Sequence, residues 1–516
     1  MLARKNRKDL RAHPTSSDSV EKASRIEWIY ALTLYGTVMV WCLLLVSTKD
    51  SQTLPYTALI TMGFIGLWRY AWQALHALRA VTYIQGHFPL YRRAADNYKN
   101  SLSFSDYPSV GFIIPSYKMP PAIFQRVFSS LLAEAHRYPA AVTMIAAVTT
   151  QEEASWIQSH FLAYFGNKPS LTCEVFLQKG MGKRQSMAQA LWRLKSYTPV
   201  DRVILMDGDT VIQAGTLQKL VGFFETQPDL GAITIDNRPV CTKHHRLIQA
   251  WYSLRMIQRH WLMTSMSVSR CLLVLTGRFS MFRGELAYED GFLQAIASDR
   301  LDHWRHGRLT MITGDDKSTW FYTLKQGWSM LYIPDTVCES MEEPVSQHFL
   351  THSRLLMMRW FGNTIRHSNQ ALALGPKKIP FFVWWCLVDQ RISPWTTLIG
   401  PTGALFLALI YHSALIPFYL LWVLISRATW ASILCLMRGP FHPYFPALLF
   451  FGQVYGAVIK IHTTFRLHRQ RWTRQNSRES EDTKEQRWMA IVLESTSYGA
   501  FILAVAVASK FLILRM

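Results

Sequence analysis

The twenty residues from Trp28 to Ser47 contain no charged side chain. A helix of about 20 apolar residues spans the hydrocarbon core of a bilayer, so this run predicts a transmembrane segment. A second apolar stretch extends from Pro55 to about Leu78 and carries one charge, Arg69. Together the two stretches predict a transmembrane hairpin within residues 28–90, which restricts the chain to folds embedded in a membrane.

Composition and charge indicate that only part of the chain lies in the membrane. Hydrophobic residues make up 50% of the chain, which is too apolar for an average soluble enzyme. The 55 basic and 34 acidic residues give a net charge of +21. Cationic residues near cytoplasmic lipid headgroups are one source of this excess, and a path for an anionic substrate is another. No nucleic-acid-binding motif accompanies the charge, so we expect no nucleic-acid partner.

The polar and basic residues 1–27 contain no signal-peptide cleavage pattern and predict an N-terminus that stays in the cytoplasm. The seven cysteines form no CxxC pair and the histidines no HExxH pattern, so no zinc or redox motif is visible. We therefore expect a reduced cytoplasmic domain.

Residues 91–378 have the pattern of an α/β domain. Four short apolar runs predict buried parallel strands, at Val110 to Ile114, Val142 to Val148, Cys173 to Leu177 and Val203 to Met206. Helical patterns separate them, at Ala122 to His136, Ala154 to Phe165 and Arg184 to Leu194. This order predicts an open, mostly parallel sheet that binds its ligand at the carboxyl ends of the strands.

Residues 379–516 return to membrane character. The aromatic, amphipathic segment from Ile379 to Asp389 is typical of an interfacial helix. Three spans fit residues 394–411, 414–437 and 489–512. The apolar segment from Phe445 to Phe465 precedes a basic loop, residues 466–488, with seven Lys or Arg. A crossing there would place that loop outside, so we expect an interfacial or re-entrant segment, a cytoplasmic loop and five spans in all.

The motif Asp207-Gly208-Asp209 directly follows the fourth predicted strand. Two carboxylates at this point can hold a divalent cation, which neutralises a departing nucleotide diphosphate. Asp-Gly-Asp is also an ordinary turn sequence. The buried strand that precedes the motif favours the functional interpretation.

A second acidic motif, Gly314-Asp315-Asp316, follows a short apolar run. One of its carboxylates can act as the general base that deprotonates an acceptor hydroxyl. The alternative is that Asp315 or Asp316 caps the helix that begins near Lys317.

Two basic motifs are candidates for phosphate binding. In Gly180-Met181-Gly182-Lys183-Arg184 the glycines permit close approach of the backbone, and the cations stand at a helix start. The spacing is not that of a Walker A loop, and a solvated basic turn is the alternative. In Arg359-Trp360 the guanidinium suits a phosphate and the indole suits a sugar face, although interfacial packing is the alternative.

Together these motifs resemble the processive family 2 glycosyltransferases, which include cellulose, chitin and hyaluronan synthases. A more specific resemblance, to the catalytic subunits of bacterial alginate polymerases (mannuronan synthases), extends over the chain. Its motifs are GKRQ at 182–185, DGDT at 207–210, LTGRFSMFR at 275–283, HWRHG at 303–307, TGDDKSTWF at 313–321, RWFGN at 359–363, DQRISPWT at 389–396 and FRLHRQRWTRQ at 465–475.

The resemblance implies a GT-A-like cytoplasmic domain inserted between membrane spans, with interfacial helices. It implies inverting transfer from GDP-mannuronate to a β-1,4-linked polymannuronate, with Mg²⁺ or Mn²⁺ as cofactor, at the bacterial inner membrane. It also implies a separate partner whose PilZ domain binds cyclic di-GMP. The chain contains an RxxxR match from Arg474 to Arg478 without the second half of the PilZ motif, so we expect no cyclic di-GMP site in it.

Motif matching also implies roles for individual residues. Asp207 and Asp209 would bind the metal and diphosphate, and Asp316, beside Asp315, would be the base. The expected nucleotide contacts are Lys183, Arg184, Arg359, Trp472, Thr473 and Arg474. The expected acceptor or polymer contacts are Thr276, Gly277, Arg278, Trp360 and Arg391.

The chain departs from the wider family at two places. Leu356 stands where the family has the glutamine of Gln-x-x-Arg-Trp. The second predicted strand ends in Thr149-Thr150-Gln151-Glu152-Glu153 and lacks an aspartate pair for a uracil ring, which is compatible with a guanine nucleotide. A synthase that uses a UDP-sugar and a catalytically inactive membrane scaffold are the two alternatives.

Overall fold

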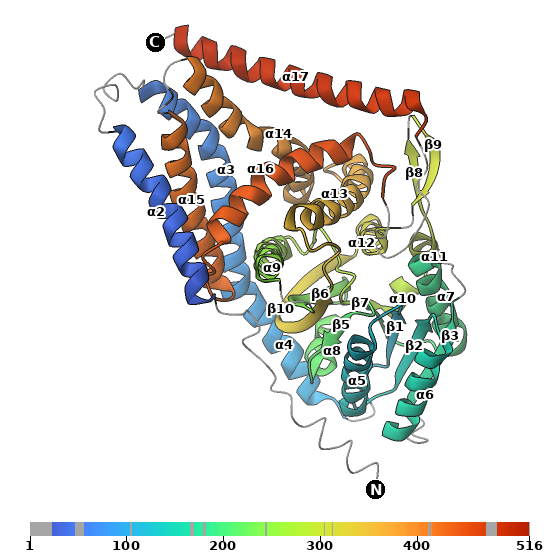
Figure 1. The fold of residues 1–516 in the computed structure, drawn as a ribbon. Coiled ribbons are helices and arrows are strands. Elements are labelled where there is room, and N and C mark those ends of the chain that lie inside the picture. Colours follow the sequence, from blue (N-terminus) through green and yellow to red (C-terminus); the bar gives the residue numbers. More distant parts are fainter. Residues whose placement is uncertain are drawn as a thin grey trace.

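An eight-stranded sheet forms the centre of the domain that lies beside the membrane helices (Figure 1). The structure, a computed structural model, describes residues 23–46, 56–103, 106–165, 170–178, 182–242, 245–303, 305–311, 313–410, 413, 415–470 and 482–514. In sheet order the strands are β3 (Leu171–Leu177), β2 (Val142–Val148), β1 (Val110–Pro115), β4 (Arg202–Leu205), β7 (Ser280–Arg283), β6 (Leu230–Cys241), β10 (Ser329–Glu342) and β5 (Thr210–Ile212).

The four predicted strands are β1 to β4, and they pair in parallel as expected. Every residue of β1, β2 and β4 is buried, which explains why each appears in the sequence as a short continuous apolar run.

Beyond β4 the sheet is mixed, and the prediction of a mostly parallel sheet is incomplete there. The four-residue strand β7 runs antiparallel to both β4 and β6, while β6 and β10 pair in parallel. Strand β7 contains only two apolar residues, Met281 and Phe282, which do not form the continuous apolar run that marks the equally short β4. A separate hairpin, β8 (Asp299–His303) and β9 (Gly307–Met311), stands apart from the sheet.

Helices cover both faces of the sheet. On one face pack α4 (Phe88–Ser101), α5 (Pro121–Arg137), α6 (Gln151–Phe165) and α8 (Thr216–Thr226). On the other face pack α7 (Gly182–Tyr197), α9 (Arg246–Ser267), α11 (Asp290–Ala297) and α12 (Asp315–Lys325). The short helix α10 (Gly284–Ala287) follows β7. The predicted helices at 122–136, 154–165 and 184–194 are thus confirmed as α5, α6 and α7.

The remaining helices form the membrane region, with α13 (Phe349–Leu374) between it and the sheet (Figure 1). They are α2 (Arg25–Val46), α3 (Tyr56–Thr82), α14 (Phe381–Ile410), α15 (Leu415–Met437), α16 (Phe445–Thr464) and α17 (Lys484–Leu514). A π-helical turn, Tyr83–His87, joins α3 to α4. Among the described residues, five helices are long and apolar enough to cross a membrane, namely α2, α14, α15, α16 and α17.

Both segments predicted to lie at the membrane interface are helical. The segment expected as a separate interfacial helix, Ile379 to Asp389, is largely the beginning of α14, which continues through Pro394 and Pro401. Proline is tolerated inside membrane helices because neighbouring groups satisfy the freed carbonyls. The segment from Phe445 to Phe465 is helix α16, which Figure 1 shows inclined to α2 and α15. Its interfacial placement stays a prediction.

Packing of α8 on α4 leaves no room at Gly222, where an added Cβ would overlap the carbonyl oxygen of Ala95. We expect Gly222→Ala to destabilise the chain by about 1–3 kcal/mol, because backbone must move to admit the methyl group. The apparent unfolding temperature in detergent measures this loss. The control is Gly86→Ala, which meets nothing within 4 Å. Equal unfolding temperatures for the two variants would contradict this packing.

Candidate active site

A cavity of about 340 Å³ opens at the carboxyl ends of β1 and β4. Its charged lining consists of Lys183, Asp207, Asp209, Arg278, Glu342, Glu343 and Arg359. The four strands therefore place the predicted metal ligands where open α/β sheets bind ligands.

Tight backbone packing fixes the turn that carries Asp207 and Asp209. The backbone nitrogen of Asp207 donates to the carbonyl of Gly277 at 2.9 Å. A Cβ added at Gly208 would lie 2.6 Å from the carbonyl oxygen of Pro115, so only glycine fits between the two aspartates. The buried Thr276 hydroxyl lies 2.9 Å from that of Thr234. Thr276 thus belongs to the buried packing beside Gly277, the residue that accepts the Asp207 hydrogen bond.

A single guanidinium bridges the two aspartates. Arg278 Nη1 lies 2.7 Å from Asp209 Oδ1 and 3.4 Å from Asp207 Oδ2, and its Nη2 lies 2.6 Å from Glu342 Oε1. One positive charge thus already lies at the point where both carboxylates converge. Burial also raises the pKa of Asp207, so its ionised form needs a cation nearby. Hard carboxylate oxygens in this arrangement fit Mg²⁺ or Mn²⁺.

Lys183 connects the two acidic motifs. Its Nζ lies 2.5 Å from Asp207 Oδ1 and 2.5 Å from Asp315 Oδ2. Although burial acts in the opposite direction, the charges of Asp207 and Asp315 raise the pKa of Lys183 above its usual value. Lys183 is therefore a permanent cation on the wall of the cavity.

The neighbouring carboxylates of Asp315 and Asp316 are in different electrostatic states. Burial opposes the change, but the charges of Lys183 and Arg184 hold the pKa of Asp315 below its usual value. Burial and the adjacent charge of Asp315 raise the pKa of Asp316. Gly314, with φ 87°, is the N-cap of α12, so neither aspartate serves as the N-cap. Of the two, Asp316 has the properties of a proton acceptor.

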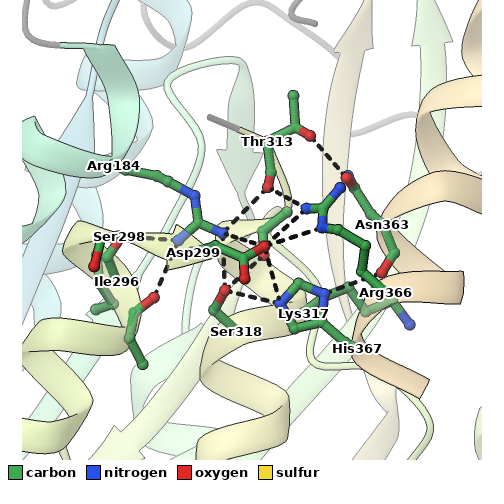
Figure 2. A network of polar contacts seen from close by, with 12 residues as sticks. Arg184, Ile296, Ser298, Asp299, Thr313, Lys317, Ser318, Asn363, Arg366 and His367 are labelled. Atoms are coloured by element: carbon green, nitrogen blue, oxygen red, sulfur yellow. Dashed lines mark hydrogen bonds and ion pairs between the residues drawn. The ribbon is translucent and has the colours of Figure 1, made fainter. Parts of the chain in front are cut away.

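A buried polar network fixes the start of α12 to α7 and α13 (Figure 2). Arg366 donates to Asp299 Oδ2 at 2.9 Å and to the carbonyl of Thr313 at 2.8 Å. Thr313 Oγ1 donates to Asn363 Oδ1 at 2.8 Å. The loop before Asp315 is thereby attached to the helix that carries Arg359.

Arg184 belongs to this network and does not line the cavity, in contrast to its expected contact with the nucleotide (Figure 2). Its guanidinium donates to the carbonyls of Ala295 and Ile296, both at 3.0 Å, and to Ser318 Oγ at 2.8 Å. Consecutive helix residues point about 100° apart, so Arg184 turns inward while Lys183 faces the cavity.

The polymer-binding candidates are dispersed. Arg359 lines the cavity, whereas Trp360 stacks on Trp251 with ring centroids 5.6 Å apart. Arg391 attaches α14 to α13, donating to the carbonyl of Ile365 at 2.5 Å. The described residues do not include Gly180, Met181, Trp472, Thr473 and Arg474.

Sequence reasoning missed several residues of the site. Tyr252, Glu342 and Glu343 line the cavity, and Asp299 and Arg366 hold the second acidic motif in place. Glu342 is the last residue of β10, whose second half contains Asp335 and Glu339, so no apolar run marks the pair Glu342-Glu343 in the sequence. Glu153, which follows β2 in the first turn of α6, accepts a hydrogen bond from the Thr149 backbone nitrogen at 3.1 Å.

Comparison with known proteins identifies the family. Residues 108–363 match the family described as "Glycosyltransferase like family 2". Glycosyltransferase alg8 of Pseudomonas syringae pv. tomato is 32% identical over 458 residues, which cover 88% of this chain and 91% of that protein. Glycosyltransferase alg8 of Azotobacter vinelandii is 33% identical over 428 residues, which cover 81% and 85%. The chain belongs to the Alg8 family of glycosyltransferases.

This family assignment confirms the resemblance to alginate polymerase catalytic subunits and the GT-A-like class with membrane helices. Two solved structures are also similar. The mannosyltransferase PcManGT from Pyrobaculum calidifontis in complex with GDP-Man and Mn²⁺ has a TM-score of 0.45 and 17% identity, with 75% of this chain and 97% of that one covered. GalNAc-T7 with UDP, GalNAc and Mn²⁺ has a TM-score of 0.33 and 10% identity, with 49% and 48% covered.

Asp299 neutralises Arg366 in the network, so its removal has a predictable cost. We expect Asp299→Asn to destabilise the domain by about 3–5 kcal/mol, since it leaves a buried guanidinium uncompensated. Thermal unfolding in detergent measures the effect. The matched control is Asp302→Asn in the same strand, because the Asp302 side chain is 76% exposed and its ion-pair partner within the described part of the chain is the exposed Arg308. If both variants unfold at the wild-type temperature, the network does not hold the loop.

Proposed function

We propose that this Alg8-family glycosyltransferase polymerises GDP-mannuronate into β-1,4-linked polymannuronate and passes the polymer across the bacterial inner membrane. The observation that carries the proposal is the position of Lys183, which lines the cavity beside Asp207 and also contacts Asp315, in a chain related to alg8 proteins along most of its length. The donor enters from the cytoplasm, where the basic N-terminus and the loop 466–488 also lie.

The diphosphate of the donor binds at the strand end. Asp207 and Asp209 would hold Mg²⁺ or Mn²⁺, which would neutralise the charge on the leaving diphosphate. Lys183 and Arg359 donate to the phosphate oxygens from the cavity wall. A guanine base is favoured because the strand β2 is followed by Thr149 and Thr150, without the aspartates that suit uracil.

Asp316 acts as the general base. It takes the proton of the acceptor hydroxyl, whose oxygen forms a bond to the anomeric carbon as the bond to the diphosphate breaks. The leaving GDP keeps the electron pair of that bond. Because the hydroxyl attacks the face opposite the leaving group, the configuration inverts in one step without a covalent sugar-enzyme intermediate. The raised pKa of Asp316 suits proton acceptance, while Asp315 stays ionised to hold Lys183.

Two neighbouring cavities support polymer exit through the membrane region. One of about 490 Å³ lies between α3, α14 and α15, and one of about 210 Å³ lies between α9, α15 and α16. Gln73, Arg427 and Gln453 line both cavities. Ionisable groups inside a membrane region usually mark a substrate path, and a polyuronate carries one carboxylate per sugar for such groups to pair with.

The synthase works with a separate partner subunit whose PilZ domain binds cyclic di-GMP. This part of the proposal rests on the resemblance to alginate polymerases. It places the regulation outside this chain, whose RxxxR match at 474–478 lacks the second half of the motif.

The proposal predicts that sugar transfer can be lost while nucleotide binding is kept. Asp316→Asn should lower polymer formation from GDP-mannuronate by about 10²- to 10⁴-fold, the usual contribution of a general base, while GDP binding persists. In the wild type, the rate should fall with decreasing pH above the range of an ordinary aspartate, because the raised pKa protonates the base earlier. Polymer formation is measured in native membranes, and GDP binding is measured by calorimetry. Exposed Asp290, as Asp290→Asn, is the control. Unchanged synthesis in Asp316→Asn would show that Asp316 is not the general base. Loss of GDP binding in that variant would show that Asp316 is not confined to that role.

The exit path predicts a defect in elongation. Arg427→Gln should shorten the polymer or slow its synthesis by about tenfold, since a charge-assisted hydrogen bond to each passing carboxylate is lost. GDP binding should be unaffected. Polymer length by size-exclusion chromatography measures the change against Arg354→Gln, an exposed arginine on α13. Wild-type polymer length in Arg427→Gln would exclude this path.

A further inference from the structure

Three histidines that do not line the catalytic cavity converge at the tip of the β8–β9 hairpin. His303 and His306 belong to the hairpin, and His468 follows α16. One donor atom from each imidazole lies within 4.8 Å of the others. We refer to His303, His306 and His468 as the histidine cluster. Figure 1 shows the hairpin reaching the beginning of α17.

A carboxylate completes the set of donors. Asp482 Oδ1 lies 2.8 Å from His468 Nε2 and 3.4 Å from His306 Nε2. The other oxygen, Oδ2, accepts from Arg469 Nε at 3.1 Å. One oxygen is therefore held by an arginine while the other faces the histidines, which is the usual arrangement of a metal-binding carboxylate and its supporting partner.

The hydrogen bonding of this site is incomplete. His468 is fully buried, and among the described residues neither of its ring nitrogens, nor Asp482 Oδ1, has a hydrogen bond of acceptable geometry. Burying such groups without partners costs free energy, so close approach of the rings does not by itself explain the cluster.

We propose that His303, His306, His468 and Asp482 bind a structural zinc ion. Three imidazoles and one carboxylate make a closed set of four ligands, typical of tetrahedral zinc. The ion would join the hairpin that precedes Asp315 to the two ends of residues 471–481, and so join the catalytic domain to α16 and α17. This site shares no ligand with the Asp207 motif.

Arg305 competes with the ion. Its Nε donates to His306 Nε2 at 3.1 Å, and its backbone nitrogen donates to His303 Nδ1 at 3.1 Å. Binding through His306 Nε2 requires release of the first contact, and the guanidinium charge repels a cation. Arg305→Gln should therefore slow the loss of zinc to a chelator, a result that a purely hydrogen-bonded cluster does not predict.

The test measures zinc in the full chain, purified in detergent without a polyhistidine tag. Mass spectrometry of the metal content should find about one zinc per chain in the wild type, in the control His348→Ala, and in the double variant Asp207→Asn with Asp209→Asn. His306→Gln and His468→Gln should contain almost none. This readout does not depend on activity, so failure of the proposed function leaves it intact.

A second measurement uses the wild type alone, so it does not depend on whether the histidine variants fold. In the wild type, a zinc chelator should lower the apparent unfolding temperature and added zinc should restore it. Absence of zinc from the wild type, together with no response to chelator or added zinc, overturns the proposal. Zinc that persists in both histidine variants overturns it as well.

Discussion

The contacts of Lys183 with Asp207 and Asp315 determine how the rest of the site is arranged. They join the turn after β4 to the start of α12 beside the cavity, with both distances at 2.5 Å. Burial raises the pKa of Asp316, and so does the charge of the adjacent Asp315, which Lys183 stabilises in its ionised form. Removing one member of such a buried set leaves an uncompensated charge, so the two acidic motifs depend on each other energetically.

Arginine side chains as well as apolar packing join α13 and the membrane helices to the catalytic domain. Arg366 on α13 holds Asp299 at the base of the β8–β9 hairpin. Arg438, after α15, lies 3.0 Å from Asp236 and donates to the carbonyl of Asn237 in β6 at 2.7 Å. Polar anchors of this kind have directional geometry, which suits a fold that must hold a donor site and an exit path in a fixed relation.

The sequence allowed prediction of those parts of the fold whose pattern is local. Strands β1, β2 and β4 are short, largely apolar runs, β3 is one that Glu174 interrupts, and Asp207 follows β4 after Met206. The strand β7 was missed because it contains only two adjacent apolar residues, and β10 because Asp335 and Glu339 interrupt its apolar pattern. The inward direction of Arg184 and the convergence of His303 with His468 depend on tertiary structure, since residues distant in the sequence meet there.

The central claim is that the Asp207 and Asp316 motifs act on a guanine-linked uronate. The most direct measurement compares GDP-mannuronate with UDP-glucuronate as donors in membranes that contain this chain and its partner, with Mg²⁺ and cyclic di-GMP. The account predicts a uronate polymer from the GDP donor alone, with GDP released in proportion to the sugar incorporated. Polymer from UDP-glucuronate, with none from GDP-mannuronate, would contradict it.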